Sequence, residues 1–278
     1  MGRPHRRDSE SGIHHVMNRG VDHQPTFRDD ADRLELGRRL AEMQEAFAVD
    51  TLAYCLMGNH FHLVLRAPPG ALPEAMHHLT SVYSHRFNAR HDRDGPLFRG
   101  RYHSIPVETD AYLLWVTRYV HRNALDIAGV PSPDAYRWSS YRAYLGLRPC
   151  PTFLDRQPVM DLLGRRVDEL AAITEGDRPV PLHAIGDVTR LVRCGLAIAD
   201  LTTSDGERPA AKVERTVLVL LARRAADPEL RRAIETELGP RTPQAAREAV
   251  RRAEARRRGD PTISLTLAWI EHQLATAA

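Results

Sequence analysis

Thr51–Arg66 has the sequence TLAYCLMGNHFHLVLR, two short apolar runs separated by a turn. Thr51–Met57 and His60–Arg66 each have the length and apolar content of a β-strand. The dipeptide Gly58-Asn59 between them is a turn signal, so the stretch predicts a β-hairpin. Because side chains alternate along a strand, His60 and His62 point to one face of the predicted sheet.

The segments around this hairpin predict an alternating order of strands and helices. Apolar residues at helical spacing indicate three helices, the first of which is capped by Asp29 or Asp30 and ends near Ala48. The expected elements outside the hairpin are a strand at Ile13–Arg19, helices at Asp30–Ala48, Leu72–Arg90 and Asp110–Leu125, and an extended arm or strand at Leu97–Val107. This order predicts an α+β, ferredoxin-like fold, an antiparallel sheet with helices on one face.

The composition is that of a globular protein. Of 278 residues, 42% are hydrophobic and 27% charged, which excludes a long disordered chain. The longest apolar runs, such as Val217–Ala222, are too short to cross a membrane. The charged start MGRPHRRDSE predicts no signal peptide, and three widely spaced cysteines predict no disulfide framework. We therefore expect a cytoplasmic protein.

Charge and histidine content are informative mainly through their distribution. The net charge, 39 − 36 = +3, is weak support for a nucleic-acid partner. Lys212 is the single lysine, so 38 of 39 basic residues are arginines, which favour bidentate phosphate contacts. A GC-rich coding bias explains the same excess equally well. Because 12 of 14 histidines precede residue 150, we expect the functional site in the first half.

The pattern changes around Cys150–Pro158, and the remainder is helical in character. We place a domain boundary near residue 150, which gives a catalytic domain at 1–150 and a helical region at 151–278. The expected helices are Val159–Thr174, Ala210–Ala225, Pro228–Leu238, Pro243–Arg258 and Ser264–Ala275, with a loop at Glu175–Pro181. Arg241–Arg258 holds seven arginines against two glutamates. DNA binding around a turn at Leu238–Pro243, a solvated helix face and oligomerisation all stay open.

Two side-chain pairs point to phosphodiester chemistry. Two imidazoles on one face of a strand, His60 and His62, can hold one divalent metal, although two surface histidines explain the spacing equally well. Tyr119 and Asn123 share a helix face at i and i+4. An amide oxygen suits Mg²⁺ or Mn²⁺, and a tyrosine can attack a phosphate and be retained as an ester. Alone, the second pair fits an amphipathic helix with a polar end. In a ferredoxin-like fold, however, the last helix can pack near the central strands, which would bring Tyr119 opposite His60 and His62.

Several segments together resemble a known family. They are HHVMNRG near Ile13–Gly20, Leu52–Leu65, Ser81–Ser104, Tyr112–Leu125 and Tyr136–Gly146, which cover about residues 12–147 in order. This combination resembles the REP-associated tyrosine transposases, single-tyrosine members of the histidine–hydrophobe–histidine (HUH) superfamily.

The resemblance implies roles for individual residues. It implies His60 and His62 as metal ligands, Tyr119 as nucleophile and Asn123 as third ligand, with Mg²⁺ or Mn²⁺ as the ion. Insertion-sequence members usually have Gln at the last position, and a shorter Asn there would change the metal geometry relative to theirs. The REP-associated members resemble this sequence in having Asn. The implied partner is single-stranded DNA with hairpins or imperfect palindromes. Cleavage would leave a 5′-phosphotyrosine and a free 3′-OH, in a homodimer or a monomer.

Other residues compete for these roles or extend them. Tyr112 and Tyr102 are alternative nucleophiles, but neither has an amide side chain four residues on. We expect DNA contacts from the arm around residues 97–103 and from three further arginines, and a solvated basic face explains each equally well. The candidates are Arg19, Arg86, Arg90, Arg99, Arg101 and Tyr102. His15 supports the metal site or packs in the core.

Two rival functions share these features. One is a domesticated, sequence-specific DNA-binding protein of the same fold that no longer cleaves. The other is a metal hydrolase that uses water, with Tyr119 in a structural role. The joint presence of His60, His62, Tyr119 and Asn123 favours the transposase over the first rival.

Overall fold

A computed structural model describes residues 9–176, 192, 211–224, 228–259, 263, 266, 267 and 270. The chain forms two compact units, residues 1–177 and 178–278, which are described separately. The first unit ends later than the boundary near residue 150 that the sequence predicts. The reason is that helices α5 (Gln157–Leu162) and α6 (Val167–Glu175) pack against α3 (Asp110–Arg122) and so belong to the first unit.

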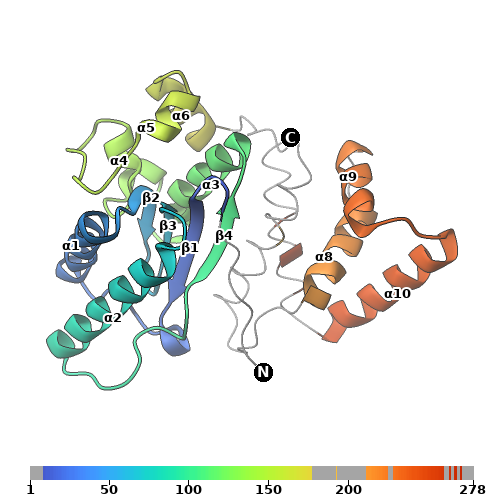
Figure 1. Ribbon diagram of the computed structural model, residues 1–278, viewed down its shortest axis with the longest axis horizontal. Helices are drawn as coiled ribbons and strands as arrows, with labels where there is room; N and C mark the ends of the chain where they lie inside the picture. Colours follow the sequence, from blue (N-terminus) through green and yellow to red (C-terminus); the bar gives the residue numbers. More distant parts are fainter. Residues whose placement is uncertain are drawn as a thin grey trace. The chain divides into compact units, whose positions relative to one another are not determined.

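The first unit is built on a four-stranded antiparallel sheet (Figure 1). Its strands are β1 (Ile13–Arg19), β2 (Asp50–Leu56), β3 (His60–Arg66) and β4 (His103–Val107). Helix α1 (Asp30–Phe47) precedes β2, and α2 (Leu72–His91) follows β3. The spatial order β2-β3-β1-β4 confirms the predicted ferredoxin-like α+β class.

The hairpin register fixes which residues lie beside the paired histidines. In β1, Arg19 is opposite His60 and Met17 is opposite His62. In β2, Cys55 is opposite His62. The three-residue connection Met57–Asn59 joins β2 to β3, in agreement with the predicted turn.

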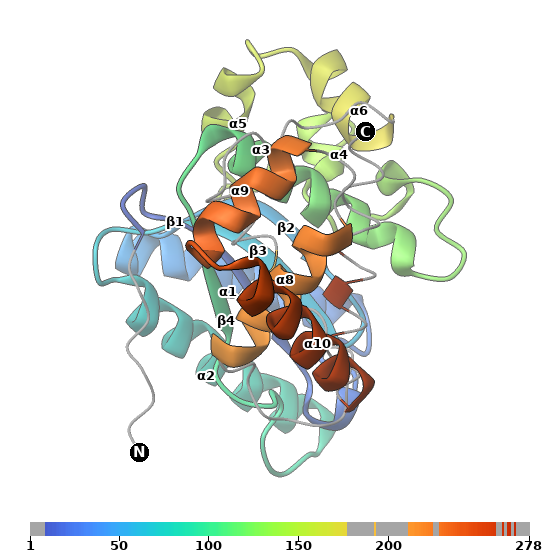
Figure 2. The ribbon, with the colours of Figure 1, turned by 90° about the vertical axis from the view of Figure 1, so that its right-hand side faces the viewer.

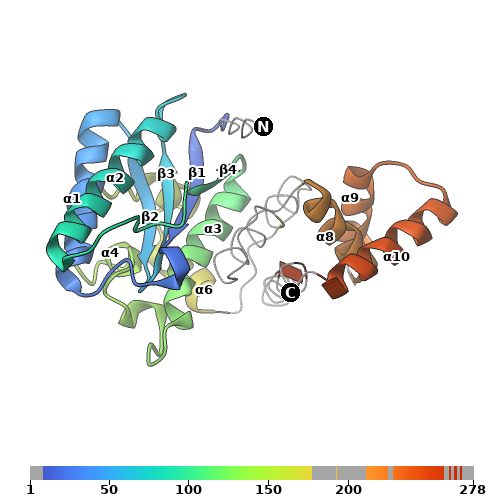
Figure 3. The ribbon, with the colours of Figure 1, turned by 90° about the horizontal axis from the view of Figure 1, so that it is seen from below.

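The two faces of the sheet are covered by different helices. Helices α1 and α2 lie on one face, as predicted, whereas α3 lies on the other (Figure 3). Side-chain contacts follow this division: the Phe61 ring lies 5.7 Å from Phe98, which lies 6.2 Å from Tyr83 of α2. The next side chain, His62, lies 5.5 Å from Tyr119 of α3. The alternation predicted for β3 therefore sends its histidines towards α3.

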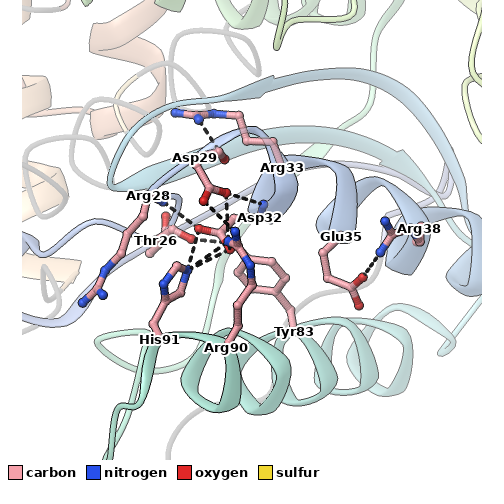
Figure 4. A network of polar contacts seen from close by, with 10 residues as sticks. All are labelled: Thr26, Arg28, Asp29, Asp32, Arg33, Glu35, Arg38, Tyr83, Arg90 and His91. Carbon is pink, nitrogen blue, oxygen red and sulfur yellow. Dashed lines mark hydrogen bonds and ion pairs between the residues drawn. The ribbon is translucent and has the colours of Figure 1, made fainter.

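A buried carboxylate joins α1 to α2 (Figure 4). Asp32 accepts hydrogen bonds from Arg90 Nη1 at 2.5 Å and from the backbone N–H of Arg28 at 2.8 Å. His91 Nε2 lies 2.9 Å from its carboxylate oxygens. Arg90 also pairs with Asp29, the N-cap of α1. These contacts connect the start of α1 to the end of α2.

The arm before β4 is extended but is only partly a strand. The predicted segment Leu97–Val107 contains β4 from His103 onwards. Before it, Arg99 N–H donates to the carbonyl of Arg19 and Val21 N–H to that of Leu97. The arm is thereby held against the end of β1.

The helices after β4 largely match the sequence prediction. The predicted helix 110–125 is α-helical to Arg122 and continues as a 3-10 turn. The helix predicted at 159–174 is instead α5 and α6, because Gly164 and Arg165 between them have positive φ angles of 58° and 63°.

In the second unit, α8 (Ala211–Arg224), α9 (Pro228–Leu238) and α10 (Pro243–Gly259) confirm three predicted helices. Both α9 and α10 pack against α8 (Figure 2). The predicted helix 264–275 and loop 175–181 lie for the most part outside the described residues. Within those residues, no helix is both long and apolar enough to cross a membrane.

Candidate active site

Both histidines of β3 are oriented through Nδ1. His60 Nδ1 lies 2.7 Å from Asn59 Oδ1, and His62 Nδ1 lies 3.2 Å from His15 Nε2. The two rings of the pair lie 5.2 Å apart. A hydrogen bond at Nδ1 leaves Nε2 as the nitrogen that can bind a metal, the usual arrangement of a metal-binding histidine and its supporting partner.

Burial keeps these histidines neutral. It lowers the pKa of His15 to about 3. The pKa of His60 is lowered to about 4, first by burial and then by the charge of Arg19. Burial, followed by His60 and His15, holds the pKa of His62 well below its ordinary value. A neutral imidazole keeps the lone pair that a metal ligand needs.

Tyr119 lies against this histidine cluster from α3. Its ring meets the His62 ring edge-on at 5.5 Å and the His15 ring at 5.8 Å. Trp115, one turn earlier, stacks on Tyr119 at 5.4 Å with an interplanar angle of 3°. Only 7% of Tyr119 is exposed, so the stacked tryptophan and the histidines define the position of its ring.

Asn123 ends α3 rather than continuing it. Its Nδ2 donates to the carbonyl of Tyr119 at 2.8 Å, as a C-terminal cap of the helix. This bond occupies the amide nitrogen and leaves Oδ1 as the atom that could face a cation. Across the described part of the chain, no group of three or more His, Cys, Asp or Glu side chains is placed to hold a metal. The candidate donors for a divalent ion are the two Nε2 atoms of His60 and His62 and the amide oxygen of Asn123, the set that the sequence predicts.

The competing tyrosines are placed differently. Tyr112 is fully buried and stacks on Trp115 at 5.5 Å. Tyr102 is 5% exposed, in the arm before β4. The ring contacts to His15 and His62 described above belong to Tyr119.

Two of the predicted DNA contacts lie beside the histidine pair. Arg19 is opposite His60 in the sheet, and its Nη1 lies 2.8 Å from Nε2 of His23. Arg99 is bonded to Arg19 through the backbone. Arg101, two residues along the arm, is exposed. The backbone bond therefore brings Arg99 of the arm to Arg19 at the end of β1, although the two lie far apart in the sequence.

The other predicted contacts lie elsewhere. Arg86 pairs with Glu35 of α1 at 3.2 Å, and Arg90 pairs with Asp29 and Asp32. Both arginines are on α2, which covers the face of the sheet opposite α3. The structure thus gives these two arginines carboxylate partners within the fold.

Two residues that position Tyr119 and His60 were not predicted from the sequence. Trp115 stacks on Tyr119, and the signal available was its spacing of one helical turn from that tyrosine. Asn59 was assigned only to the turn, yet its side chain orients His60. Its position directly before the first histidine was the available signal.

The site thus consists of two histidines on a central strand of an antiparallel sheet and a tyrosine of the helix that covers this face of the sheet. Residues 9–123 match the family model described as transposase, IS200 like. A solved structure of a REP-associated tyrosine transposase bound to a REP hairpin is similar at a TM-score of 0.42 and 13% identity. The likeness covers 56% of this chain and 93% of that one. No curated protein matches the sequence.

Proposed function

We propose that this protein is a transposase that cleaves and rejoins single-stranded DNA at hairpins or palindromic repeats, through a covalent 5′-phosphotyrosine on Tyr119. The observation that carries the proposal is the contact between the Tyr119 and His62 rings, 5.5 Å apart across α3 and β3. It supports a shared site for a nucleophile and a metal. The family of residues 9–123 supports DNA as the substrate.

His60, His62 and Asn123 would hold Mg²⁺ or Mn²⁺. When bound, the ion supplies Lewis-acid polarisation of the scissile phosphate and neutralises its developing charge. His15 and Asn59 hold the two imidazoles with Nε2 directed away from their hydrogen-bonded Nδ1. The site therefore combines ligands with side chains that fix their orientation.

The remaining steps belong to the chain itself. The Tyr119 hydroxyl gives up its proton as its oxygen attacks phosphorus, and the bond from phosphorus to the 3′ oxygen breaks. The 3′ oxygen takes up a proton and leaves as a 3′-OH, and the 5′ phosphate stays on the tyrosine. A free 3′-OH can reverse the step, because the phosphotyrosine ester retains the bond energy. Trp115 limits rotation of the Tyr119 ring by stacking on it. A fixed nucleophile lowers the entropic part of the barrier.

Arg19, Arg99 and Arg101 are the predicted DNA contacts that we assign to the strand near Tyr119. Their guanidinium groups would bind backbone phosphates. Arg86 and Arg90 would first have to exchange their carboxylate partners. Tyr102 would have to leave its buried position before a base could stack on it.

A substitution at Tyr119 tests the proposal. Tyr119→Phe removes the attacking oxygen but keeps the ring stacked on Trp115. We expect hairpin binding to survive and the covalent protein–DNA adduct to disappear in Mg²⁺ or Mn²⁺, as measured on a denaturing gel with labelled single-stranded repeats. An adduct that persists in this variant would falsify the assignment of the nucleophile.

The same assay separates the rival functions. A protein that binds hairpins and never nicks them with any divalent ion is the non-cleaving DNA-binding protein. Nicking without a trapped adduct, unchanged in Tyr119→Phe, identifies a hydrolase that uses water. The burial of Tyr119 on Trp115 is the feature that such a structural role would explain.

A further inference from the structure

A pocket in the C-terminal unit is lined by arginines and by no acidic residue. It has a volume of about 300 Å³ and lies between α8 and α10. Its polar lining consists of Arg215, Thr216, Arg241, Arg252 and Arg256, and the rest is small and apolar, three alanines and a valine. Four guanidinium groups around one cavity repel one another, so a built arrangement of this kind suits an anion.

The lining cations are only partly compensated by the protein. Arg215 Nη2 donates to the Leu238 carbonyl at 2.9 Å, and Arg256 Nη1 donates to Thr216 Oγ1 at 3.3 Å. Both acceptors are neutral. Arg252 is 72% exposed and pairs with Glu248 outside the pocket, at 3.2 Å. Burial and the neighbouring charge of Arg215 lower the pKa of Arg241, which agrees with like charges held close together.

The neighbouring cavity differs in charge. It has a volume of about 1100 Å³ and is also lined by arginines, but Glu235 and Glu254 lie among them. Carboxylates in a cavity disfavour a bound anion by charge repulsion. The smaller pocket is therefore the better candidate for an anion.

The start of α10 adds to the positive potential of the pocket. This 17-residue helix begins at Pro243, directly after Thr242, whose Oγ1 accepts the N–H of Ala245 at 3.2 Å. Ala245 lines the pocket, in the first turn of the helix. The amino end of a long helix has a partial positive charge, which acts in the same direction as the arginines.

We propose that this pocket binds a phosphate group of the DNA backbone and so gives the transposase a second DNA contact in its C-terminal unit. The choice of DNA rests on the proposed function, because a DNA-cleaving enzyme has this polyanion as its substrate. Arginine forks match the geometry of a phosphate.

Matched pairs of arginine substitutions in the full chain test the pocket. Arg241→Gln with Arg252→Gln removes two lining charges. Arg165→Gln with Arg257→Gln removes the same charge at positions outside the pocket. The probe is a labelled single-stranded DNA hairpin, and its Kd is measured by fluorescence anisotropy over a series of salt concentrations.

We expect the pocket pair to raise the Kd about tenfold at low salt and the control pair to change it less than about twofold. Loss of one phosphate contact lowers the slope of log Kd against log salt by about 1. Equal changes in Kd for the two pairs would overturn the proposal. It would also be overturned if polyglutamate fully displaced the DNA from the unsubstituted protein while the pocket pair bound DNA with unchanged Kd. If the double variant does not fold, the exposed Arg252→Gln alone, with Arg257→Gln as control, decides.

Adduct formation keeps this test separate from the proposed function. On a short single-stranded oligonucleotide at saturating concentration, the pocket pair should form the Tyr119 adduct at the rate of the unsubstituted protein. If the pocket pair raises the Kd as expected but neither protein forms the adduct, the phosphate pocket is supported and the phosphotyrosine mechanism is rejected. If both proteins form the adduct but the pocket pair leaves the Kd unchanged, only the pocket is rejected.

Discussion

The two faces of the sheet use the same residue types in opposite ways. On the face covered by α1 and α2, His91 and Arg90 lie against the buried carboxylate of Asp32 (Figure 4). On the face covered by α3, His62 lies against another histidine and a tyrosine. Among the described contacts of His60 and His62, none is to a carboxylate.

This difference separates architecture from chemistry. A charged pair that is satisfied within the fold stabilises the packing of two helices and has little capacity left for a ligand. Neutral imidazoles with an available nitrogen gain more from an added cation than from each other. We therefore expect substitutions on the α3 face to reduce activity, and those on the α1–α2 face to reduce stability.

A matched histidine pair gives the largest expected contrast. His60→Ala removes a proposed metal ligand, and we expect the rate of adduct formation in Mn²⁺ to fall by about a thousandfold, which corresponds to the several kcal/mol that metal catalysis supplies. His91→Ala removes a partner of Asp32 and should lower the melting temperature while leaving the adduct rate per folded molecule unchanged. Single-turnover gel assays and thermal melts measure both.

The contrast fails if His91→Ala lowers the adduct rate as much as His60→Ala at equal folded fraction. It also fails if His60→Ala reacts at the normal rate. Either result would show that the two faces do not divide activity from stability. Metal titration by calorimetry provides the control, since only His60→Ala should weaken binding.

The sequence predicted which face His60 and His62 share, but it left open which residues orient them. Alternation along β3 and the Gly58-Asn59 turn sufficed for the hairpin, because both are local rules. The approach of Tyr119 to His62 was expected from the packing of the last helix near the central strands. The expectation that all helices lie on one face was wrong, because α3 covers the face opposite α1 and α2, and the order of elements does not specify which face a helix covers. The hydrogen bond from Asn123 to the Tyr119 carbonyl could not be predicted from the sequence. The same amide group can cap its own helix or bind a ligand, and the sequence does not distinguish the two.

The assignment of Arg86 and Arg90 as DNA contacts shows a second limit. Their carboxylate partners on α1 lie 51 to 61 residues away in the chain, so composition alone leaves both arginines uncompensated. Only the packing of α1 on α2 brings Glu35, Asp29 and Asp32 to them. Charge that is unpaired in sequence is often paired in the fold. In the C-terminal unit Arg252 likewise pairs with Glu248, but no carboxylate lines the smaller pocket itself.

The carboxylate network gives the next largest effect. Asp32→Ala removes a buried acceptor of three hydrogen-bonding partners, and we expect the free energy of unfolding to fall by about 3 kcal/mol, reduced from the cost of a fully buried pair because Arg90 is partly exposed. Urea unfolding at pH 7.5 measures this change. The adduct rate per folded molecule should stay normal, and Glu45→Ala, on the same helix, serves as the control for loss of one acidic side chain. A lower adduct rate at full folding would mean that α1 and α2 contribute to the site.

The smallest effect concerns protonation on the α3 face. His121 is buried against Ser140, with its Nε2 2.8 Å from Oγ, and burial lowers its pKa to about 3. The unfolded chain, with the ordinary pKa near 6.5, binds the extra proton first, so the free energy of unfolding should fall as the pH drops below 6.5 towards 3. His121→Phe removes this proton, and the pH dependence should become shallower by up to about 1.4 kcal/mol per pH unit. Urea unfolding of both proteins between pH 7.5 and 4.5 separates the two contributions: the difference at pH 7.5 reports packing, and only its change with pH reports protonation. Parallel curves would show that His121 is protonated equally in the folded and unfolded states, and the neutral, buried character of this face would then not extend beyond the histidine pair.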